Sequence, residues 1–355
     1  MKKARLAVIR RMVLALLLAG VCVVRFCPGA GEWYALRLYP SLSYALSFLA
    51  SAVPFSLDEV LVLAVVTGLV VGIPWAKWKG VRWKRIGCMV GEAALWMYVW
   101  FYWGWGMNYF RDSLYVRAGA APAVYDEVRF RRFLADYTQR LNDAYLPSFS
   151  IGQVQVPDSL RTAFCRVPSR YGLSRPAAFQ HPKRSCCNAL YSGVGVLGYM
   201  GPFFVESHLN HDLLPQQYPF TYAHELSHLL GVSSEAEANY WAYRMCVSSS
   251  DACIRWSGYF GLFGYVAVNA RAALSDADYQ EWLQTVRPEV KSLYLEQRSY
   301  WHAKYSPLLG TLQEKLYHFY LKGNNIPSGR KNYAEVVGLL LSLPEEAAAD
   351  WTREN

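Results

Sequence analysis

HELSHLLGVSSEAEANYWAYRM, residues 224–245, is the stretch on which the rest of the chain depends. It opens with the motif histidine–glutamate–x–x–histidine. Positions four apart share one face of an α-helix, so the imidazoles of His224 and His228 can reach one metal ion. Glu225 lies beside them, placed to act on a water bound to that ion. Two imidazoles and a carboxylate with one open coordination position are typical of a catalytic zinc site.

The residues after the motif must supply the third ligand. Gly231 predicts the end of the first helix, because glycine adopts the left-handed conformation found at C-terminal caps. Ser233 or Ser234 then predicts the start of a second helix, which carries two glutamates. Ser234 and Glu237 fit a capping box, which gives Glu237 a structural role and leaves Glu235 as the predicted ligand.

Asn239 follows Glu235 by one helical turn, where its side chain would hydrogen-bond a metal-bound histidine. This pattern resembles the gluzincin peptidases, in which a glutamate followed four residues later by Asp or Asn completes an H-E-x-x-H site. The resemblance implies that His224, His228 and Glu235 bind one Zn²⁺. It also implies that Glu225 is the general base and that Asn239 supports a ligand. The gap before Glu235 is shorter than in most gluzincins.

A second resemblance covers most of the chain. It rests on three apolar segments near the N-terminus and on WGMNYFR (103–111 region), GYMGPFFVESHLN, PFTYAHELSHLLG and YLKGNNIPSGRKNYAEVV. On these segments the chain resembles a bacterial family of uncharacterised membrane proteins, domain-of-unknown-function family 3810. The family implies no activity, so the expected chemistry rests on the residues themselves.

The composition of the N-terminal third indicates a membrane anchor. The chain has 355 residues, of which 53% are hydrophobic and 15% aromatic, and a formal net charge of +9. Apolar runs predict transmembrane helices near residues 6–26, 60–76 and 86–105. The aromatic, proline-interrupted segment 31–57 predicts short interfacial helices. A signal peptide is the alternative for the first segment, although no convincing cleavage site follows it.

The distribution of basic residues predicts the orientation of the anchor. MKKARLAVIRR at the N-terminus and KWKGVRWKR between the second and third segments each carry five basic residues and no acid. The positive-inside rule places both clusters in the cytoplasm. Residues 1–106 would then anchor the chain in a bacterial inner membrane as a multi-pass protein, with residues 107–355 on the periplasmic face. The clusters also explain the basic balance without a nucleic-acid partner, for which no motif is present.

Residues 107–355 are long enough for one globular domain. Glycines and alternating residues over 183–210 predict its β region. The expected fold is therefore mainly α with a small β-sheet, an α+β zincin-like domain preceded by three transmembrane helices. In zincins a strand before the motif helix lines the cleft, which is an expectation by analogy. Periodicity predicts helices at 125–145, 158–166, 219–230, 233–248, 252–272, 276–292, 294–321 and 333–343.

The sequence leaves the oxyanion-stabilising residue open. Tyr240 and Tyr243 lie on the second helix of the site, while Glu206 and His208 alternate on the predicted strand. All four are candidates for an oxyanion donor or for the lining of the cleft. A second metal site at Glu206 and His208 is disfavoured, because no third ligand has suitable spacing.

The cysteines of the expected outer domain are compatible with disulfides, because that compartment is oxidising. Five of them fall in this part of the chain, so at least one stays unpaired within it. No C-x-x-C motif occurs, which disfavours a cysteine zinc site and thioredoxin-like chemistry. The five are Cys165, Cys186, Cys187, Cys246 and Cys253.

These observations predict a membrane-anchored zinc metallopeptidase acting on a peptide or protein substrate. A zinc-activated water would attack the peptide bond, with Glu225 as the general base. The alternative is a catalytically inactive zincin-like membrane scaffold or binding protein. Loss of a ligand or of the base would mark that alternative, and both are present in the sequence.

Overall fold

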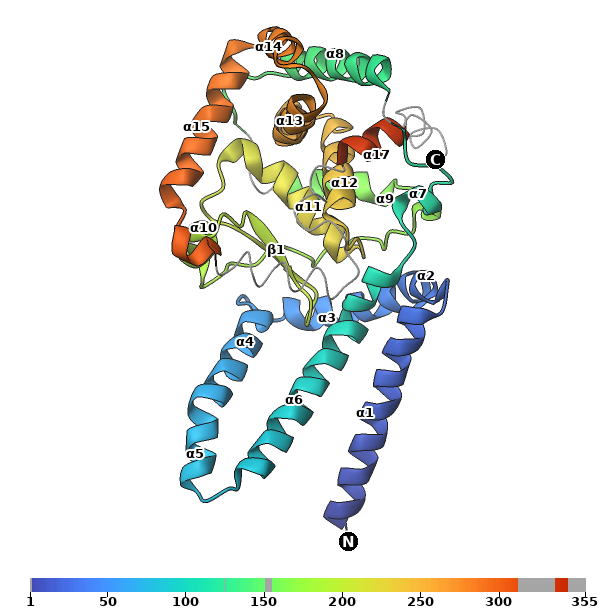
Figure 1. Ribbon diagram of the computed structural model, residues 1–355, viewed down its shortest axis with the longest axis vertical. Helices are drawn as coiled ribbons and strands as arrows, with labels where there is room; N and C mark the ends of the chain where they lie inside the picture. The colour runs from blue at the N-terminus through green and yellow to red at the C-terminus, as the bar shows by residue number, and fades with distance from the viewer. Residues whose placement is uncertain (1, 125, 151–154, 312–335, 344–355) are drawn as a thin grey trace.

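Helices α1 (Lys2–Phe26), α4 (Leu57–Thr67) and α6 (Trp83–Gly104) extend from one end of a mainly helical body in the computed structural model (Figure 1). The structure describes residues 2–124, 126–150, 155–311 and 336–343. Within these ranges the chain is mainly helical and contains one sheet of two strands. The prediction of a mainly α protein with a small sheet is confirmed.

Two of the extending segments are long and apolar enough to cross a membrane. One is Arg5–Phe26 within α1, and the other is Leu57–Trp78, in which α4 continues through a π-helical turn into α5 (Ile73–Trp78). Only 11% of the apolar window of the first segment and 0% of that of the second is buried within the protein. Their apolar side chains therefore face outward, as expected of helices that contact lipid.

The third predicted span, 86–105, forms a helix that is less apolar. Tryptophans and tyrosines, together with the basic residues of its first turn, lower the mean hydropathy of α6, and Glu92 adds a charge. Arg10 of α1 donates to Glu92 over 2.9 Å, so the two helices meet through an ion pair. Of the three predicted apolar spans, the described part of the chain therefore shows two, and α6 is not apolar enough to count as the third by its composition.

Short helices join the extending segments to the body. They are α2 (Ala30–Trp33), a π-helical turn over Tyr34–Leu38, and α3 (Tyr39–Ser51). Figure 1 shows them at the junction between the extending helices α1, α4 and α6 and the body. A buried, mostly aromatic cluster fixes this junction, comprising Val21, Tyr34, Tyr39, Tyr102, Trp105 and Met107.

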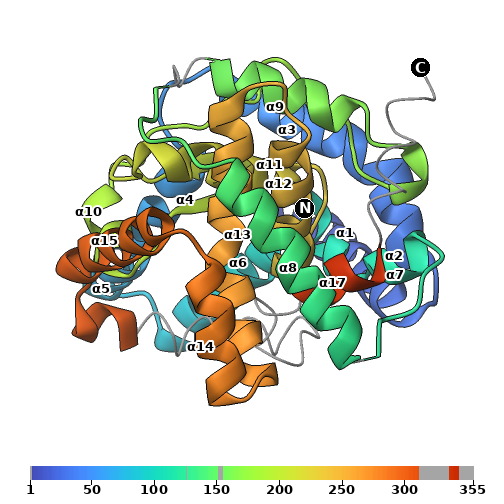
Figure 2. The same ribbon diagram turned by 90° about the horizontal axis from the view of Figure 1, so that it is seen from above.

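The core of the body consists of three packed helices, α11 (Tyr218–Leu229), α12 (Glu235–Val247) and α13 (Ala252–Ala273). Every residue of α12 from Ala236 to Cys246 is buried. A helix buried on all sides is a central element, and Figure 2 shows the others around it. These are α7 (Leu114–Arg117), α8 (Glu127–Asp143), α9 (Gln155–Cys165), α10 (Asn188–Gly193), α14 (Asp276–Thr285), α15 (Pro288–Lys304) and α17 (Val336–Ser342).

Several boundaries differ from the prediction. The expected β region 183–210 forms strands only in its second half, because its first half contains α10. The expected helix 276–292 ends at Thr285, and Pro288 occupies the first position of α15, where its missing N–H is not needed. Residues 312–321 and 333–335 of the last two predicted helices lie outside the described residues.

The strands β1 (Gly198–Gly201) and β2 (Glu206–Leu209) form an antiparallel hairpin with Gly198 opposite Leu209 and Gly201 opposite Glu206. The hairpin packs against α11, the helix that carries the H-E-x-x-H motif. The sheet is therefore small, but it lies directly beside the residues of chemical interest.

Gly231, in the turn between α11 and α12, provides a test of this arrangement. Its φ is +94°, and a Cβ there would lie 3.1 Å from Cε1 of Tyr39. We expect Gly231→Ala to lower the free energy of unfolding by about 1–2 kcal/mol for the backbone conformation alone, and further because the Tyr39 ring must move.

Gly119→Ala is the matched control, since Gly119 has φ +63° and open space around it. Unfolding of the detergent-solubilised chain should show a larger loss for Gly231→Ala. Equal losses would contradict the close contact with Tyr39.

Candidate metal centre

Three side chains from two helices converge on one point. His224 Nε2 lies 3.1 Å from His228 Nε2, both on α11. Oε2 of Glu235, the first residue of α12, lies 3.1 Å from His224 Nε2 and 3.7 Å from His228 Nε2. The three atoms form one of two groups in the described chain that could hold a metal ion.

The turn between the two helices sets this convergence. Gly231 takes the left-handed conformation that ends α11, and Ser234 caps α12 by accepting a hydrogen bond from the Glu237 N–H over 3.4 Å. The chain thereby reverses direction within a few residues. Glu235 begins the second helix next to the last turn of the first, so its carboxylate meets both imidazoles.

The second nitrogen of each imidazole also has a partner. His224 Nδ1 lies 2.9 Å from Asn239 Oδ1, and His228 Nδ1 lies 2.7 Å from the carbonyl oxygen of Val232. Both partners are acceptors, so a protonated Nδ1 donates to each of them. In the neutral imidazoles this leaves both Nε2 lone pairs directed at the convergence point, which is the tautomer that a metal ligand needs.

His228 and Glu235 shift each other's pKa values toward the charged forms. Burial would lower the pKa of His228, but the Glu235 carboxylate outweighs it and raises this pKa to about 9. Burial would likewise raise the pKa of Glu235, and the two histidines instead hold it far below its ordinary value. The cluster therefore pairs a carboxylate with the His228 imidazole, and a metal cation would displace the proton that this pairing favours.

Glu225 is buried beside the cluster. Its Oε2 accepts no hydrogen bond from the part of the chain that the structure describes. Burial raises the pKa of Glu225 to about 6, although His224 and His228 act in the opposite direction. A Cβ on Gly198 would lie 2.7 Å from Glu225 Oε1, so β1 passes directly over this carboxylate. Buried carboxylates without a partner are costly and are typical of functional sites.

Glu237, the competing glutamate, points elsewhere. Its carboxylate pairs with Arg117, and both side chains are almost fully buried. Trp241 Nε1 also donates to Glu237 Oε1 over 3.0 Å. The capping box is thus half formed, because Ser234 accepts from the Glu237 N–H while the Glu237 carboxylate serves a buried ion pair.

The two tyrosines of α12 lie in the core. Tyr240 packs against the neighbouring Trp241, and Tyr243 packs against Tyr259 of α13. A tyrosine that the sequence did not single out, Tyr265 of α13, is closer to the centre. Burial raises its pKa to about 12, the charge of Glu235 adds to the rise, and the nearby Asn239 side chain opposes it. No spacing rule links positions 239 and 265, since only the packing of α13 on α12 brings them together.

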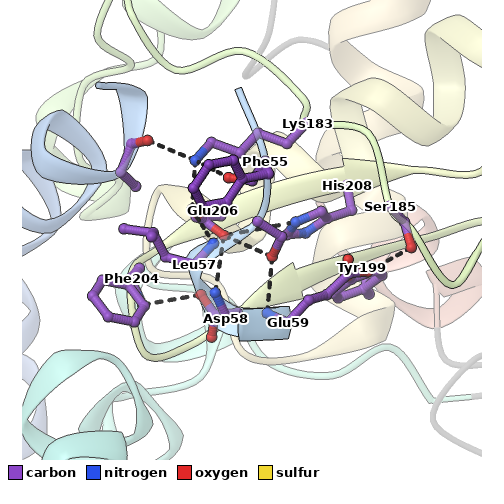
Figure 3. A network of polar contacts seen from close by, with 12 residues as sticks. Phe55, Leu57, Asp58, Glu59, Lys183, Ser185, Tyr199, Phe204, Glu206 and His208 are labelled. Atoms are coloured by element: carbon purple, nitrogen blue, oxygen red, sulfur yellow. Dashed lines mark hydrogen bonds and ion pairs between the residues drawn. The ribbon is translucent and has the colours of Figure 1, made fainter. Parts of the chain in front are cut away.

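His208 and Glu206 belong to a buried polar network on β2, drawn in Figure 3. Lys183 Nζ lies 2.6 Å from Glu206 Oε1, and Ser56 donates to Glu206 Oε2 over 2.9 Å. The His208 ring stacks on Tyr199 at a centroid distance of 4.2 Å. Burial lowers the pKa of His208 to about 4, so its imidazole is neutral at physiological pH.

The same network ties the hairpin to the first turn of α4. The backbone N–H groups of Leu57 and Asp58 donate to Glu206 over 3.1 and 3.3 Å. In return, the Asp58 carboxylate accepts from the N–H groups of Phe203 and Phe204 over 3.0 and 3.1 Å. Carboxyl oxygens thus satisfy free N–H groups both at the helix start and in the hairpin loop (Figure 3).

A family model described as "Protein of unknown function (DUF3810)" matches residues 34–341. The chain belongs to this family. The match confirms the predicted family and includes the whole candidate metal centre. No curated protein and no solved structure matches the chain. The family description names no activity, so the chemistry must be inferred from the residues.

The different surroundings of the two glutamates lead to a stability prediction. Glu237→Ala would leave Arg117 buried without its partner, which should lower the free energy of unfolding by about 3–5 kcal/mol. Ser234→Ala, which removes only the N-cap, should cost about 0.5–2 kcal/mol. Denaturant unfolding of the two variants measures the difference. A loss for Glu237→Ala no larger than that for Ser234→Ala would contradict the role of the buried ion pair.

Proposed function

We propose that the protein is a membrane-anchored zinc metallopeptidase that hydrolyses peptide bonds in a peptide or protein substrate. The observation that carries the proposal is the buried, unpartnered Glu225 carboxylate next to three convergent ligand atoms. A purely structural metal site has no need of such a group. An acyl-transfer site needs it to accept a proton.

The residues present fit a single zinc ion. Two imidazole nitrogens and one carboxylate oxygen are the protein ligands of one major class of catalytic zinc sites, and they leave the fourth position to water. His224, His228 and Glu235 would hold the ion. When bound, it would make its water acidic enough to act as a nucleophile near neutral pH.

The protein groups around the ligands have separate tasks. Glu225, whose pKa is raised to about 6, is mostly ionised at neutral pH and accepts the proton of the attacking water. It then donates that proton to the departing amine. Asn239 and the Val232 carbonyl keep the imidazoles in orientation. Tyr265 is the candidate donor to the developing oxyanion, in place of the core residues Tyr240 and Tyr243.

The hairpin suggests where a substrate chain would lie. Gly198 has no side chain, which leaves room for the Glu225 carboxylate beneath β1. Among the described residues β1 pairs only with β2, so an extended peptide would pair with its other edge as an added strand. Pairing with that edge would place a peptide bond beside Glu225 and the ligands.

Point variants of the full-length protein test the proposed chemistry. Glu225→Gln should retain zinc near the level of the unmodified protein and lose activity by about 100- to 10,000-fold, because only the proton acceptor is gone. His224→Ala should lose the ion of this centre together with activity, because one of its three protein ligands is gone. Chelator-sensitive cleavage of a mixed peptide library and metal analysis of the detergent-solubilised protein supply the measurements.

Glu281→Gln is the matched control, since Glu281 is an exposed glutamate on α14. It should change neither metal content nor cleavage. A Glu225→Gln variant that cleaves as fast as the unmodified protein would overturn the peptidase proposal and leave the alternative of an inactive scaffold.

We also propose that α1, α4–α5 and α6 all cross a membrane, with the body on the outer, periplasmic face. The N-terminus and the turn between α5 and α6, which carry the two basic clusters, lie at the same end, far from the body (Figure 1). The ion pair between Arg10 and Glu92 neutralises the charge that α6 would bring into the bilayer.

Reporter fusions test this topology. A reporter placed after Asn108 should be active on the outer side, and one placed within 77–85 should be active in the cytoplasm, because acid-free basic clusters stay inside. Truncation at the fusion point keeps the preceding spans intact. Cytoplasmic activity of the Asn108 fusion would contradict the orientation.

A further inference from the structure

A second group of potential metal ligands lies at the outer end of α4. It combines Glu59, in the first turn of that helix, with the adjacent cysteines Cys186 and Cys187, just before α10. One ligand atom from each residue lies within 4.8 Å of the other two. Both cysteines are exposed, so the group is accessible to ions from solution.

The spacing of the sulfurs suits a metal better than a disulfide. Cys186 Sγ and Cys187 Sγ are 3.9 Å apart. Two thiolates bound to one zinc ion at about 2.3 Å with tetrahedral angles stand about 3.8 Å apart. A disulfide would require the same atoms to come together to about 2.05 Å. The observed separation therefore matches two corners of a tetrahedral site.

The carboxylate of the group is already oriented. Its Oε1 accepts hydrogen bonds from Ser185 Oγ and, over 2.8 Å, from the Tyr199 hydroxyl, and Figure 3 shows these residues together. Its Oε2 faces Cys186, accepting from the backbone N–H over 3.0 Å and from the thiol over 2.9 Å. Donors of this kind orient carboxylate ligands in metal sites. The thiol proton at Oε2 occupies the place that a cation would take.

We propose that Glu59, Cys186 and Cys187 bind a thiophilic divalent cation, Zn²⁺, in a site separate from the histidine centre. Binding forms two metal–sulfur bonds and one metal–oxygen bond and releases the two thiol protons to solvent, so no oxidant is needed. Water fills the fourth position on the exposed side. Soft thiolate ligands favour zinc over the calcium and magnesium ions that prefer oxygen.

This site would connect the anchor to the hairpin. Glu59 belongs to α4, Cys186 and Cys187 belong to the body, and Tyr199 extends the contact to β1. Gly198, the neighbour of Tyr199 in β1, lies against Glu225. The bound ion would therefore stabilise the strand that passes over the histidine centre without touching that centre.

The test uses the full-length protein, purified in detergent with a reductant and stripped of metal by a chelator. A His224→Ala/His228→Ala variant should still bind one Zn²⁺ per chain. With Co²⁺ in place of Zn²⁺, it should show the near-ultraviolet absorption of cobalt–thiolate bonds, which two imidazoles and a carboxylate do not give. Replacing both Cys186 and Cys187 with serine in that background should abolish the binding and the absorption.

Cys165→Ser is the matched control, because Cys165 is exposed on α9 and is not part of the group. It should leave the number of bound ions unchanged. Glu59→Gln keeps an oxygen for Ser185 and Tyr199 but loses the carboxylate ligand, so it should weaken Zn²⁺ binding at least tenfold. Thermal unfolding of each metal-free variant checks that it is folded.

Either of two results would overturn the proposal: no ion bound to the His224→Ala/His228→Ala variant, or a bound ion without cobalt–thiolate absorption. Failure of this site leaves the peptidase proposal intact, because that proposal predicts only that the histidine variants lose the ion of their own centre.

Discussion

The packing of α12 against α11 across the turn at Gly231 is the constraint on which the candidate centre depends. The turn alone would bring Glu235 near the histidines, but it would not hold the carboxylate in place. The buried pair of Arg117 and Glu237 and the bond from Trp241 fix the first turn of α12 in the core. Glu235 is thereby positioned by the groups that hold its neighbour two residues away.

Residues from the N-terminal third of the chain also hold α11 in place. Tyr39 donates to the carbonyl of Leu229, and Trp105 Nε1 donates to the carbonyl of His228 over 3.0 Å. These carbonyls lie in the last turn of α11, beyond the regular hydrogen bonds of the helix, and the His228 carbonyl also accepts from the Gly231 N–H over 3.1 Å. Residues next to the predicted membrane segments therefore complete the helix that carries the motif. For this reason the centre and the segments that carry Tyr39 and Trp105 form one hydrogen-bonded unit.

The parts of the centre that the sequence predicted are those set by local geometry. The spacing of His224 and His228 follows from the helical repeat, and the choice of Glu235 over Glu237 follows from the capping rule, which needs only neighbouring residues. The partner of Glu237 is 120 residues away and no local rule identifies it. Tyr265 was missed for the same reason. The hydropathy of the third predicted span was overestimated, because its many tryptophans and tyrosines were counted as apolar. Their indole N–H and phenol O–H groups make these side chains less apolar than aliphatic ones.

Two carboxylates in the first turn of α4, Asp58 and Glu59, attach this helix to the hairpin. Asp58 holds the loop of the hairpin, and Glu59 holds Tyr199 within β1. A spanning helix adjusts its tilt to the thickness of the bilayer around it. If α4 and α5 span the bilayer as proposed, any such tilt would pull on both attachments and shift the strand that covers Glu225. A change in bilayer thickness would then alter the geometry of the centre through the orientation of this one helix.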